Sequence, residues 1–579
     1  MAGWLRATLA ALLLLAAVLL PAARIDAHKA RHRAELAEAP RLEASRLTPD
    51  DDPYIERVTQ PYPVSSAGLL RLFLLADAVL LASWGRLRRY AGGQPGAALP
   101  RLWPAGEGRY VAALTAGGFV LRATGSNRDL WIDEITTLMR HVRSPVSEIL
   151  LQATSSNNHL LNSLLGHLSV AALGEHAWTL RLPALVFGTL TIPVVYALAR
   201  RYSPLRETLF ATVAFTLSYH HVFFSQDARG YTGFLFGGLL GTLALLHAVE
   251  RDHSRTWAVY VGSMVISVTS VMLGVVLLAS QAIAVTVLRP VRRFYWMAAF
   301  CGYLVAHVYA LVIPDILGFV FDDYKRPEVG WKFSGELVQV VLRGLALGPA
   351  AAAVVLAAAL VAGIGVVSYW RQDRLFTSLM LLPELLMLAA ILGLGVAVFP
   401  RFFLFALPVA FLLCARGTMA VLSRLPPVMA DRAGYPAAVA GMIVISLFML
   451  GTWWRYPKQD YTGARRFVEQ REAAGDAVVA VGIAGEAYRY YWPEIEITNR
   501  VSELHDIEAH HRRVWLLYAF RRDMEQRRPK LLRRIEDEFV QEREFPGMVG
   551  DGQVRVWLRV RPDAQVSLAD VVRAAGAGE

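Results

Sequence analysis

The sequence predicts an all-α domain that crosses a membrane many times, followed by a small soluble α/β domain. Hydrophobic residues occupy 55% of the 579 positions and charged residues only 18%. The mean hydropathy is +0.38, so the chain is too apolar for a soluble globule. Thirteen apolar runs are long enough, some marginally, to cross about 30 Å of hydrocarbon as helices. After residue 455 the composition changes to a dense mixture of charges with short strand-like runs.

The apolar runs divide the chain into three parts. We expect an N-terminal extension at residues 1–108 with two spans and an outer loop, a transmembrane domain at 109–454, and a soluble domain at 455–579. The first run could be a cleaved signal peptide; we favour a retained helix, and the later topology is the same in either case. The runs lie near residues 7–23, 69–84, 109–122, 182–199, 208–224, 232–248, 256–270, 271–288, 294–313, 344–369, 375–399, 402–422 and 435–454.

The arginines between the runs predict which side each loop faces, because cationic loops resist translocation and stay in the cytoplasm. With the N-terminus inside, the loops at 123–181, 225–231 and 314–343 face outward, as does everything after residue 455. The net charge of +11 is then explained by topology and lipid headgroups rather than by nucleic acid. The arginines assigned to the cytoplasmic side are Arg86, Arg88, Arg89, Arg101, Arg200, Arg201, Arg206, Arg251, Arg255, Arg289, Arg292, Arg293, Arg371, Arg374, Arg424 and Arg432.

Two outer segments and the C-terminal domain carry patterns of local structure. The stretch 24–68 fits an outer loop with a surface helix near residues 30–46, and the apolar spacing in 123–181 predicts amphipathic helices at the membrane interface. The C-terminal domain lacks a P-loop and a GxGxxG fingerprint, so nucleotide hydrolysis has no visible site. Its expected elements are strands at 476–482, 514–520 and 553–560, a helix over 461–475 ended by Gly475, and a charged amphipathic helix over 523–543.

Asp133 and Glu134 form the first candidate site. They follow Trp131 where the chain leaves a predicted span on the outer side. Two adjacent acidic residues can have different roles, one accepting a proton while the other orients a partner or binds a cation. The alternative is a solvated helix start, which is the commoner explanation for an isolated pair of this kind.

The outer turn SQDARGY forms the second candidate site. It crowds Gln226, Asp227, Arg229 and Tyr231 between two spans. Arg229 could pair with a carboxylate or a lipid phosphate, because the guanidinium fork matches either geometry. It could equally anchor the helix at the interface, with Tyr231 in the aromatic belt.

Further cations and polar residues lie on the same predicted side. Lys325, Arg326 and Arg401 break the positive-inside trend and, with Arg229, could receive a phosphate from the outer leaflet. For Arg401 alone, helix anchoring is the favoured explanation. Asn158 and His159, in SSNNHLLN, could contact a hydroxyl-rich substrate, although helix capping by Asn157 or Asn158 explains the asparagines at least as well.

Other ionisable residues predict structural roles. His159 and His167, eight residues apart, do not make a metal site, and no site for a divalent cation or another cofactor is indicated. Cys301 and Cys414 both fall within predicted spans, which favours core positions over a disulfide. For Glu384, His220, His221 and His307 we favour hydrogen bonding within the membrane domain over a proton relay.

The order of these motifs resembles a known family. A WxDE exit at residues 131–134, the helix RLPALVFGTLTIPVVYALARRY, then SQDARGY, RFFLFALP and PKQDYTGARRFVEQ are similar to the C-type polytopic glycosyltransferases of the protein mannosyltransferase and aminoarabinose transferase type, that is, glycosyltransferase family 39-like proteins. The resemblance covers about residue 110 to the end. Two departures are NNHLLN in place of a His-Pro-rich segment, and Asp227 where a Glu is common.

The resemblance implies a reaction and roles for the residues. A sugar would pass from a polyprenyl-phosphate donor to an acceptor hydroxyl or amine on the outer face of the cytoplasmic membrane, with inversion at the anomeric carbon. Asp133 would be the general base and Glu134 its neighbour; Gln226, Asp227, Arg229 and Tyr231 would belong to the second outer loop's site, and Arg401 would approach the carrier phosphate. A lipid-linked sugar flippase without covalent chemistry is the alternative.

Overall fold

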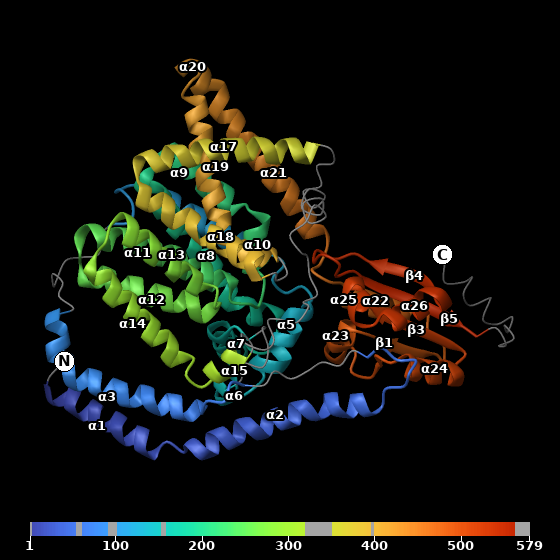
Figure 1. The fold of residues 1–579 in the computed structure, drawn as a ribbon. Helices are drawn as coiled ribbons and strands as arrows, with labels where there is room; N and C mark the ends of the chain where they lie inside the picture. Colours follow the sequence, from blue (N-terminus) through green and yellow to red (C-terminus); the bar gives the residue numbers. More distant parts are fainter. Residues whose placement is uncertain are drawn as a thin grey trace. The chain divides into compact units, whose positions relative to one another are not determined.

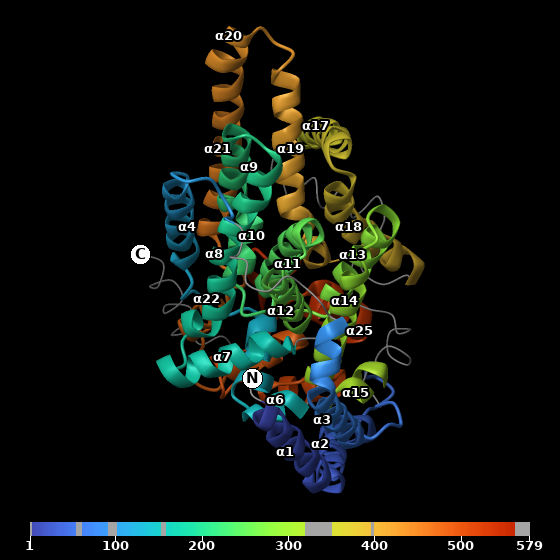
Figure 2. The same ribbon diagram turned by 90° about the vertical axis from the view of Figure 1, so that its left-hand side faces the viewer.

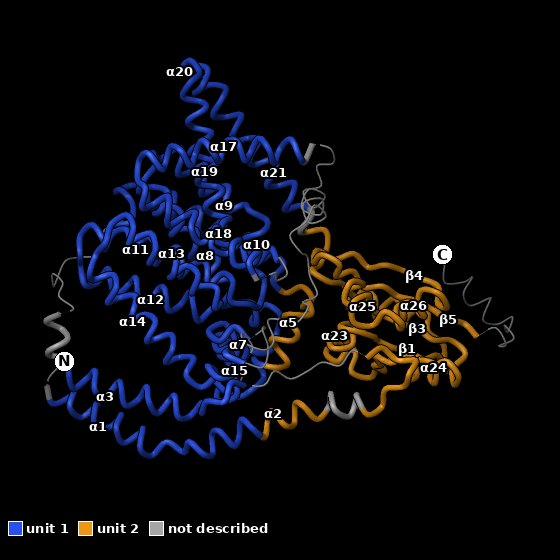
Figure 3. The backbone as a smooth tube through the Cα atoms, viewed as in Figure 1, with its two compact units in different colours: residues 1–30, 59–126, 141–451 blue, residues 31–58, 127–140, 452–579 orange. Residues whose placement is uncertain are grey.

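The computed structural model describes residues 3–53, 61–90, 101–151, 158–318, 350–394 and 399–561. They form two compact units (Figure 3). Unit 1 comprises Met1–Ala30, Thr59–Ser126 and His141–Gly451, and unit 2 comprises Arg31–Val58, Asn127–Arg140 and Thr452–Glu579. Unit 1 is helical, whereas unit 2 contains a five-stranded sheet (Figure 1).

Unit 1 is built from apolar helices that follow the predicted runs. Its principal helices are α1 (Gly3–Leu19), α3 (Ser66–Tyr90), α4 (Gly108–Ala123), α6 (Val146–Leu151), α7 (Leu160–Leu173), α8 (Ala177–Tyr202), α9 (Leu205–Thr216), α10 (Tyr219–Ser225), α11 (Tyr231–Arg251), α12 (Ser254–Ser270), α13 (Gly274–Leu288), α14 (Arg292–Val308), α15 (Ile313–Gly318), α17 (Ala350–Gln372), α18 (Arg374–Leu394), α19 (Ala406–Leu422), α20 (Pro427–Met429) and α21 (Tyr435–Arg455). Helix α2 (Ala22–Ser45) contributes to both units. Figure 2 shows α20 at the end of the hairpin made by α19 and α21.

The chain is a multi-pass membrane protein. Among the described residues, six helices are long and apolar enough to cross a membrane, or seven if the bent pair α1–α2 is one span. The predicted number of thirteen is not confirmed, because other predicted runs form shorter helices. The predicted division near residue 270 is confirmed by the break between α12 and α13.

One predicted span is wrong as a single helix. The run at 208–224 divides into α9 and α10, because Ser218 begins a new helix, with its Oγ accepting a hydrogen bond from the His221 backbone N–H at 3.4 Å. The continuous apolar character of the run hides this N-cap, which is a local polar contact.

The helices of unit 1 differ in how much of them is covered by protein. The apolar windows of α8 and α11 are 72% and 83% buried, whereas those of α17 and α21 are 11% and 6% buried. Helices α8 and α11 are therefore inner helices, and the apolar surfaces of α17 and α21 are left for lipid. Gly365 of α17 and Gly417 of α19 each face the other helix's backbone so closely that a Cβ would collide with it, which lets this pair pack tightly.

The sheet of unit 2 has the strand order β2-β1-β3-β5-β4. Strand β1 pairs in parallel with β2 and β3, while β5 pairs antiparallel with β3 and β4. The strands are β1 (Ala477–Ala480), β2 (Glu496–Ile497), β3 (Arg513–Tyr518), β4 (Val540–Phe545) and β5 (Val554–Val560). The helices are α5 (Ile132–Thr137), α22 (Tyr461–Glu469), α23 (Ile483–Tyr491), α24 (Val501–His510), α25 (Arg521–Arg527) and α26 (Pro529–Glu538).

Three predicted strands of this unit are confirmed, and two predicted helices are corrected. The helix from residue 461 ends at Glu469 rather than at Gly475, which instead has φ +93° in the turn before β1. The charged segment 523–543 is not one helix: α25 and α26 meet at Pro529, which begins α26, and the segment's end is strand β4.

A short acidic segment from the N-terminal extension completes unit 2. We call residues 48–52 the acidic strap. The Asp51 carboxylate accepts hydrogen bonds from the backbone N–H and the hydroxyl of Ser502, both at 2.9 Å, and the Asp52 carboxylate accepts from the backbone N–H groups of Lys530 and Leu531, both at 3.0 Å. These donors lie in the first turns of α24 and α26, so each aspartate caps a helix far away in sequence.

Candidate functional site

Apart from Asn158, the described site residues that the sequence predicts fall into two clusters, one in each unit, together with neighbours that the structure adds. The acid cluster, in unit 2, consists of Asp129, Trp131, Asp133, Glu134, Lys458 and Gln459. The arginine cluster, in unit 1, consists of His159, Gln226, Asp227, Arg229, Tyr231 and Arg401. Lys325, Arg326 and Asn157 lie outside the described residues.

The acid cluster is built around the start of α5. Trp131 precedes the helix in an extended conformation, with φ −92° and ψ 170°, and its backbone N–H donates to Glu134 Oε2 at 3.3 Å. Two acids in a first helical turn also match the partial positive charge of a helix N-terminus. The local sequence therefore explains both the start of the helix and the position of its acids.

Glu134 and Asp133 have different environments although they are neighbours in sequence. Glu134 is fully buried, at 0% exposure, and its Oε1 lies 3.4 Å from Lys458 Nζ, which is itself 3% exposed. Asp133 is half-buried. Glu134 is therefore not a solvated helix-start residue: its charge is compensated inside the protein.

The segment that carries these acids is anchored at several points in unit 2. The Ile132 backbone N–H donates to Gln459 Oε1 at 3.0 Å, and the Leu130 backbone N–H donates to the Tyr491 hydroxyl at 2.6 Å. Burial raises the pKa of Tyr461 well above its ordinary value, and the negative charge of Asp133 adds to that rise.

In the arginine cluster, Gln226 holds the outer turn. Its Nε2 donates to the backbone carbonyls of Arg122 and Thr124, each at 2.7 Å, at the end of α4. The amide of Gln226, 1% exposed, therefore ties the turn to α4. Asp227, also 1% exposed, lies in the same turn, and its backbone carbonyl accepts from the Arg229 N–H at 2.6 Å.

Arg229 donates to His159, which comes from a different part of the chain. Arg229 Nη2 lies 2.9 Å from His159 Nε2, and His159 Nδ1 lies 3.0 Å from the Ser270 carbonyl oxygen. Because a guanidinium only donates, Nε2 must accept, and the proton of the neutral ring must be on Nδ1, facing Ser270. The ring of Tyr231 meets His159 edge-on, with centroids 5.0 Å apart, and the Arg229 guanidinium lies 5.3 Å from its centroid.

His159 is held neutral. Burial lowers the pKa of His159 well below its ordinary value, and the positive charges of Arg229 and Arg401 lower it further. The grouping of Arg229 with Arg401 at a phosphate site stays a prediction. Arg401 also stacks on Phe399, with its guanidinium carbon 4.2 Å from the ring centroid, so the helix-anchoring explanation also has support.

Asn158 and the histidines of the membrane domain have structural partners. Asn158 Oδ1 accepts from the Ser163 hydroxyl at 2.9 Å and its Nδ2 donates to the Ile149 carbonyl at 3.3 Å, contacts that join α6 and α7. His221 Nδ1 lies 2.6 Å from Arg122 Nη2, and His307 Nδ1 lies 3.4 Å from Asp77 Oδ2. The predicted structural hydrogen bonding is thereby confirmed for His221, whereas His307 lies within ion-pair distance of Asp77.

Sequence reasoning missed three residues of the site. Arg122 is fully buried and donates to His221 as well as to the Gly118 and Thr216 carbonyls; an arginine at the outer end of an apolar run was its available signal. Lys458 and Gln459 stand inside the segment PKQDY, but only their contacts with α5, across more than 300 residues, show what they do.

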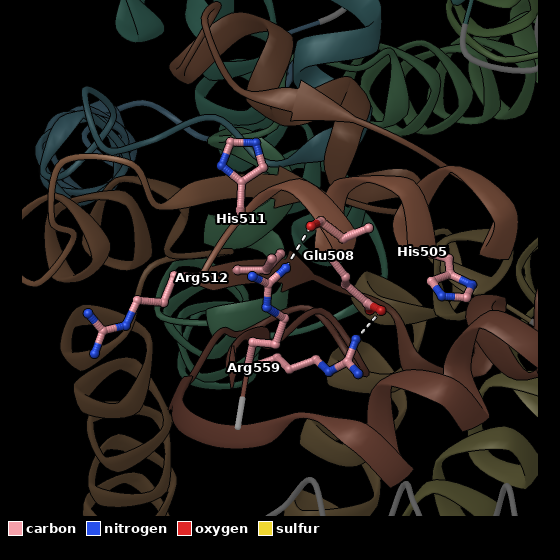
Figure 4. A pocket seen from close by; sticks show the side chains of 8 residues that line it. His505, Glu508, His511, Arg512 and Arg559 are labelled. Carbon is pink, nitrogen blue, oxygen red and sulfur yellow. Dashed lines mark hydrogen bonds and ion pairs between the residues drawn. The ribbon is translucent and has the colours of Figure 1, made fainter. Parts of the chain in front are cut away.

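A third cluster of charged residues lines a cavity of about 130 Å³ in unit 2. Figure 4 shows Glu508 between arginines, with His505 and His511 nearby. Glu508 forms ion pairs with Arg534 and Arg559, so the charges here stabilise the domain. In the described ranges, no group of three or more His, Cys, Asp or Glu residues could hold a metal ion.

Comparisons with known proteins found similarity among solved structures. No family model and no curated protein sequence matches the chain. ArnT from Cupriavidus metallidurans in the apo state is similar with a TM-score of 0.48 and 11% identity over 79% of this chain and 99% of that one. The same protein bound to undecaprenyl phosphate gives 0.43 and 12%, over 80% and 100% of the two chains. The oligosaccharyltransferase of Archaeoglobus fulgidus gives 0.43 and 11%, over 73% and 71%.

With TM-scores below 0.5 the likeness does not transfer residue roles. The roles proposed below rest on the contacts of this chain's own residues.

Proposed function

We propose that this protein is a membrane glycosyltransferase that moves a sugar from a polyprenyl-phosphate-linked donor to an acceptor hydroxyl or amine. The proposal rests first on the order of the sequence motifs. The structural observation that carries it is the contrast between two adjacent acids: Glu134 is buried against Lys458, while Asp133 remains half-buried. Two titratable groups in such different environments can take different roles, one structural and one chemical.

Asp133 is the proposed general base. Its carboxylate takes the proton of the acceptor as the acceptor oxygen or nitrogen attacks the anomeric carbon. The bond from that carbon to the phosphate oxygen breaks, and its electron pair leaves with the polyprenyl phosphate, so a single displacement inverts the anomeric centre. Proton removal by a positioned base contributes about 10²- to 10⁴-fold to the rate, and orientation of the reactants contributes more.

Arg229 and Arg401 are the proposed ligands of the carrier phosphate. A guanidinium offers donors in a fork that matches phosphate oxygens, and its charge stabilises the negative charge that develops on the leaving group. His159 supports this role because its neutral ring accepts from Arg229 without adding a cation. Gln226, Asp227 and Tyr231 belong to the turn that carries Arg229, and Lys325 and Arg326 are additional candidates for the phosphate site.

Membrane topology supports an outer location for the chemistry. The acidic strap and residues 127–140 both contact the C-terminal domain within unit 2, so all three lie on one side of the membrane. An even number of crossings must then separate them; we propose two between residues 53 and 127 and ten between residues 140 and 455, with the pair α9–α10 counted as one crossing. With the arginine-rich loops inside, this side is the outer face of the cytoplasmic membrane.

The test combines a binding measurement with a transfer measurement. We expect purified Asp133→Asn to bind undecaprenyl phosphate, the probe, as tightly as the wild type. We expect it to fail to restore the glycans, analysed by mass spectrometry, that cells lacking the gene no longer make. Asp506→Asn, at an exposed position of the same unit, is the matched control and should restore them.

Two outcomes decide between the alternatives. Full restoration by Asp133→Asn would remove Asp133 as base and favour a flippase, which needs binding but no proton transfer. Arg229→Ala and Arg401→Ala should each weaken binding of undecaprenyl phosphate by about tenfold or more, since a hydrogen bond to a charged group contributes about 1.5–3 kcal/mol. Unchanged binding in both would move the phosphate site elsewhere.

A further inference from the structure

Gln459 joins three parts of unit 2 through one side-chain amide. Its Oε1 accepts from the Ile132 backbone N–H at 3.0 Å and from the Tyr461 hydroxyl at 3.2 Å, and its Nε2 donates to the Gly552 carbonyl at 3.0 Å. The side chain is 0% exposed. Both ends of the amide are therefore used, and the joint links α5, α22 and the turn before β5.

Lys458 secures the same helix by a different contact. Its ammonium lies 3.4 Å from the buried Glu134 carboxylate and 5.8 Å from the centroid of the Trp131 ring. A buried carboxylate depends on such compensation, because removing charge from water is costly. Two consecutive residues, Lys458 and Gln459, thus hold the first turn of α5.

Asp133 lies between the two anchored positions. Gln459 fixes the backbone of Ile132 before it, and Lys458 fixes the side chain of Glu134 after it. Successive residues of an α-helix project about 100° apart. With Glu134 directed to Lys458, the Asp133 side chain leaves the helix in a different direction, and the Thr137 hydroxyl bonds to the Asp133 carbonyl at 2.8 Å.

We propose that Lys458 and Gln459 are positioning residues, through which the C-terminal domain sets the location of the Asp133 carboxylate. This inference rests on the proposed function, because it matters for catalysis only if Asp133 is the base. It gives the soluble domain a direct part in the reaction. A displacement of about 1 Å at a catalytic group can cost about 10²-fold in rate, which is the effect expected when the joint is broken.

The test compares two substitutions of Gln459. Gln459→Met removes every hydrogen bond of the amide, whereas Gln459→Glu keeps an acceptor for Ile132 and Tyr461, and its carboxyl group, held protonated by the cost of burying a charge, donates to the Gly552 carbonyl. Gln470→Met, at an exposed position just after α22, is the matched control. Amide hydrogen exchange of residues 127–140, glycan formation and binding of undecaprenyl phosphate are measured for each.

We expect Gln459→Met to exchange at least tenfold faster in residues 127–140 and to form product about 100-fold more slowly, with unchanged binding of undecaprenyl phosphate. Gln459→Glu should recover most of both properties, which general loss of stability in unit 2 would not explain. Two results for Gln459→Met would overturn the inference. One is hydrogen exchange at the wild-type rate, and the other is faster exchange with product formation at the wild-type rate. Hydrogen exchange is measured independently of activity. If the wild type forms no product, the proposed function is refuted, while the exchange measurement still tests whether Gln459 holds residues 127–140.

Discussion

The ion pair between Lys458 and Glu134 gives a prediction about stability that is independent of activity. In Lys458→Met the Glu134 carboxylate stays buried but loses its compensating charge, since both side chains are at most 3% exposed. Breaking a buried pair in this way costs about 3–5 kcal/mol. At about 2–4 °C per kcal/mol for a unit of this size, the unfolding midpoint should fall by about 10 °C.

The double variant separates a charge effect from a packing effect. Lys458→Met with Glu134→Gln removes both charges while keeping similar volumes, and replacing both members of a buried pair is often close to neutral. We therefore expect the double variant to be more stable than Lys458→Met, with a coupling energy of about 2 kcal/mol or more. The exposed pair between Arg140 and Glu486, 2.6 Å apart with 46% and 29% of the side chains exposed, is the control; Arg140→Met should cost at most about 1 kcal/mol.

The assay is thermal unfolding of the full chain in detergent, followed by proteolysis and mass spectrometry of peptides from residues 501–561. These peptides report unit 2 alone, so unfolding of the membrane helices does not obscure the transition. If Lys458→Met and the double variant unfold at the same temperature, the uncompensated charge is not the cause of the instability, and the reasoning fails.

Two further predictions concern pH and the strap. Because the pKa of His159 is depressed from its ordinary 6.5 in the folded protein, the unfolded chain binds more protons below about pH 6.5, and the unfolding midpoint of unit 1 should fall as the pH drops from 7 to 5. His159→Gln offers an acceptor but does not titrate, so its unfolding midpoint should depend less on pH. An equal pH dependence in the variant and the wild type would contradict the role of His159. Asp51→Ala and Asp52→Ala should each destabilise unit 2 by about 1 kcal/mol because a helix cap is lost, while Asp50→Ala, at an exposed position, should change the stability little. Although burial raises the pKa of Asp51, hydrogen bonds from Ser502 and Thr48 lower it overall, so the stabilisation by Asp51 should disappear only as the pH falls below about 4. Loss of that stabilisation near neutral pH would refute the capping role.

The sequence predicted features that depend on hydrophobicity and on local spacing. Apolar runs located most helices of unit 1, although not the number of spans, and the side of the membrane that each loop faces stays a prediction. A helix start at Asp133 and Glu134 was the alternative explanation of this pair, and both acids do lie in the first turn of α5. In each case the information lies within about twenty neighbouring residues, which is the range over which periodicity and capping act.

Features that depend on contacts between distant residues could not be predicted from the sequence. Strand β2 has two residues and β4 is highly charged, so neither shows an apolar pattern; their pairing with β1 and β5 defines them. Nothing near Gln459 indicates that it binds the Ile132 backbone, 327 residues away. The different environments of Asp133 and Glu134 depend on Lys458 for the same reason.

The acidic strap also orders events during biosynthesis. Asp51 and Asp52 are made long before their partners, which follow 451 and 478 residues later. The first turns of α24 and α26 can gain these acceptors only after residues 501–531 have been made, late in synthesis. A chain cut short near residue 500 would leave Asp51 and Asp52 solvated, and a soluble fragment beginning at residue 455 would lack two helix caps. Supplying residues 46–53 as a peptide should therefore slow proteolysis of that fragment.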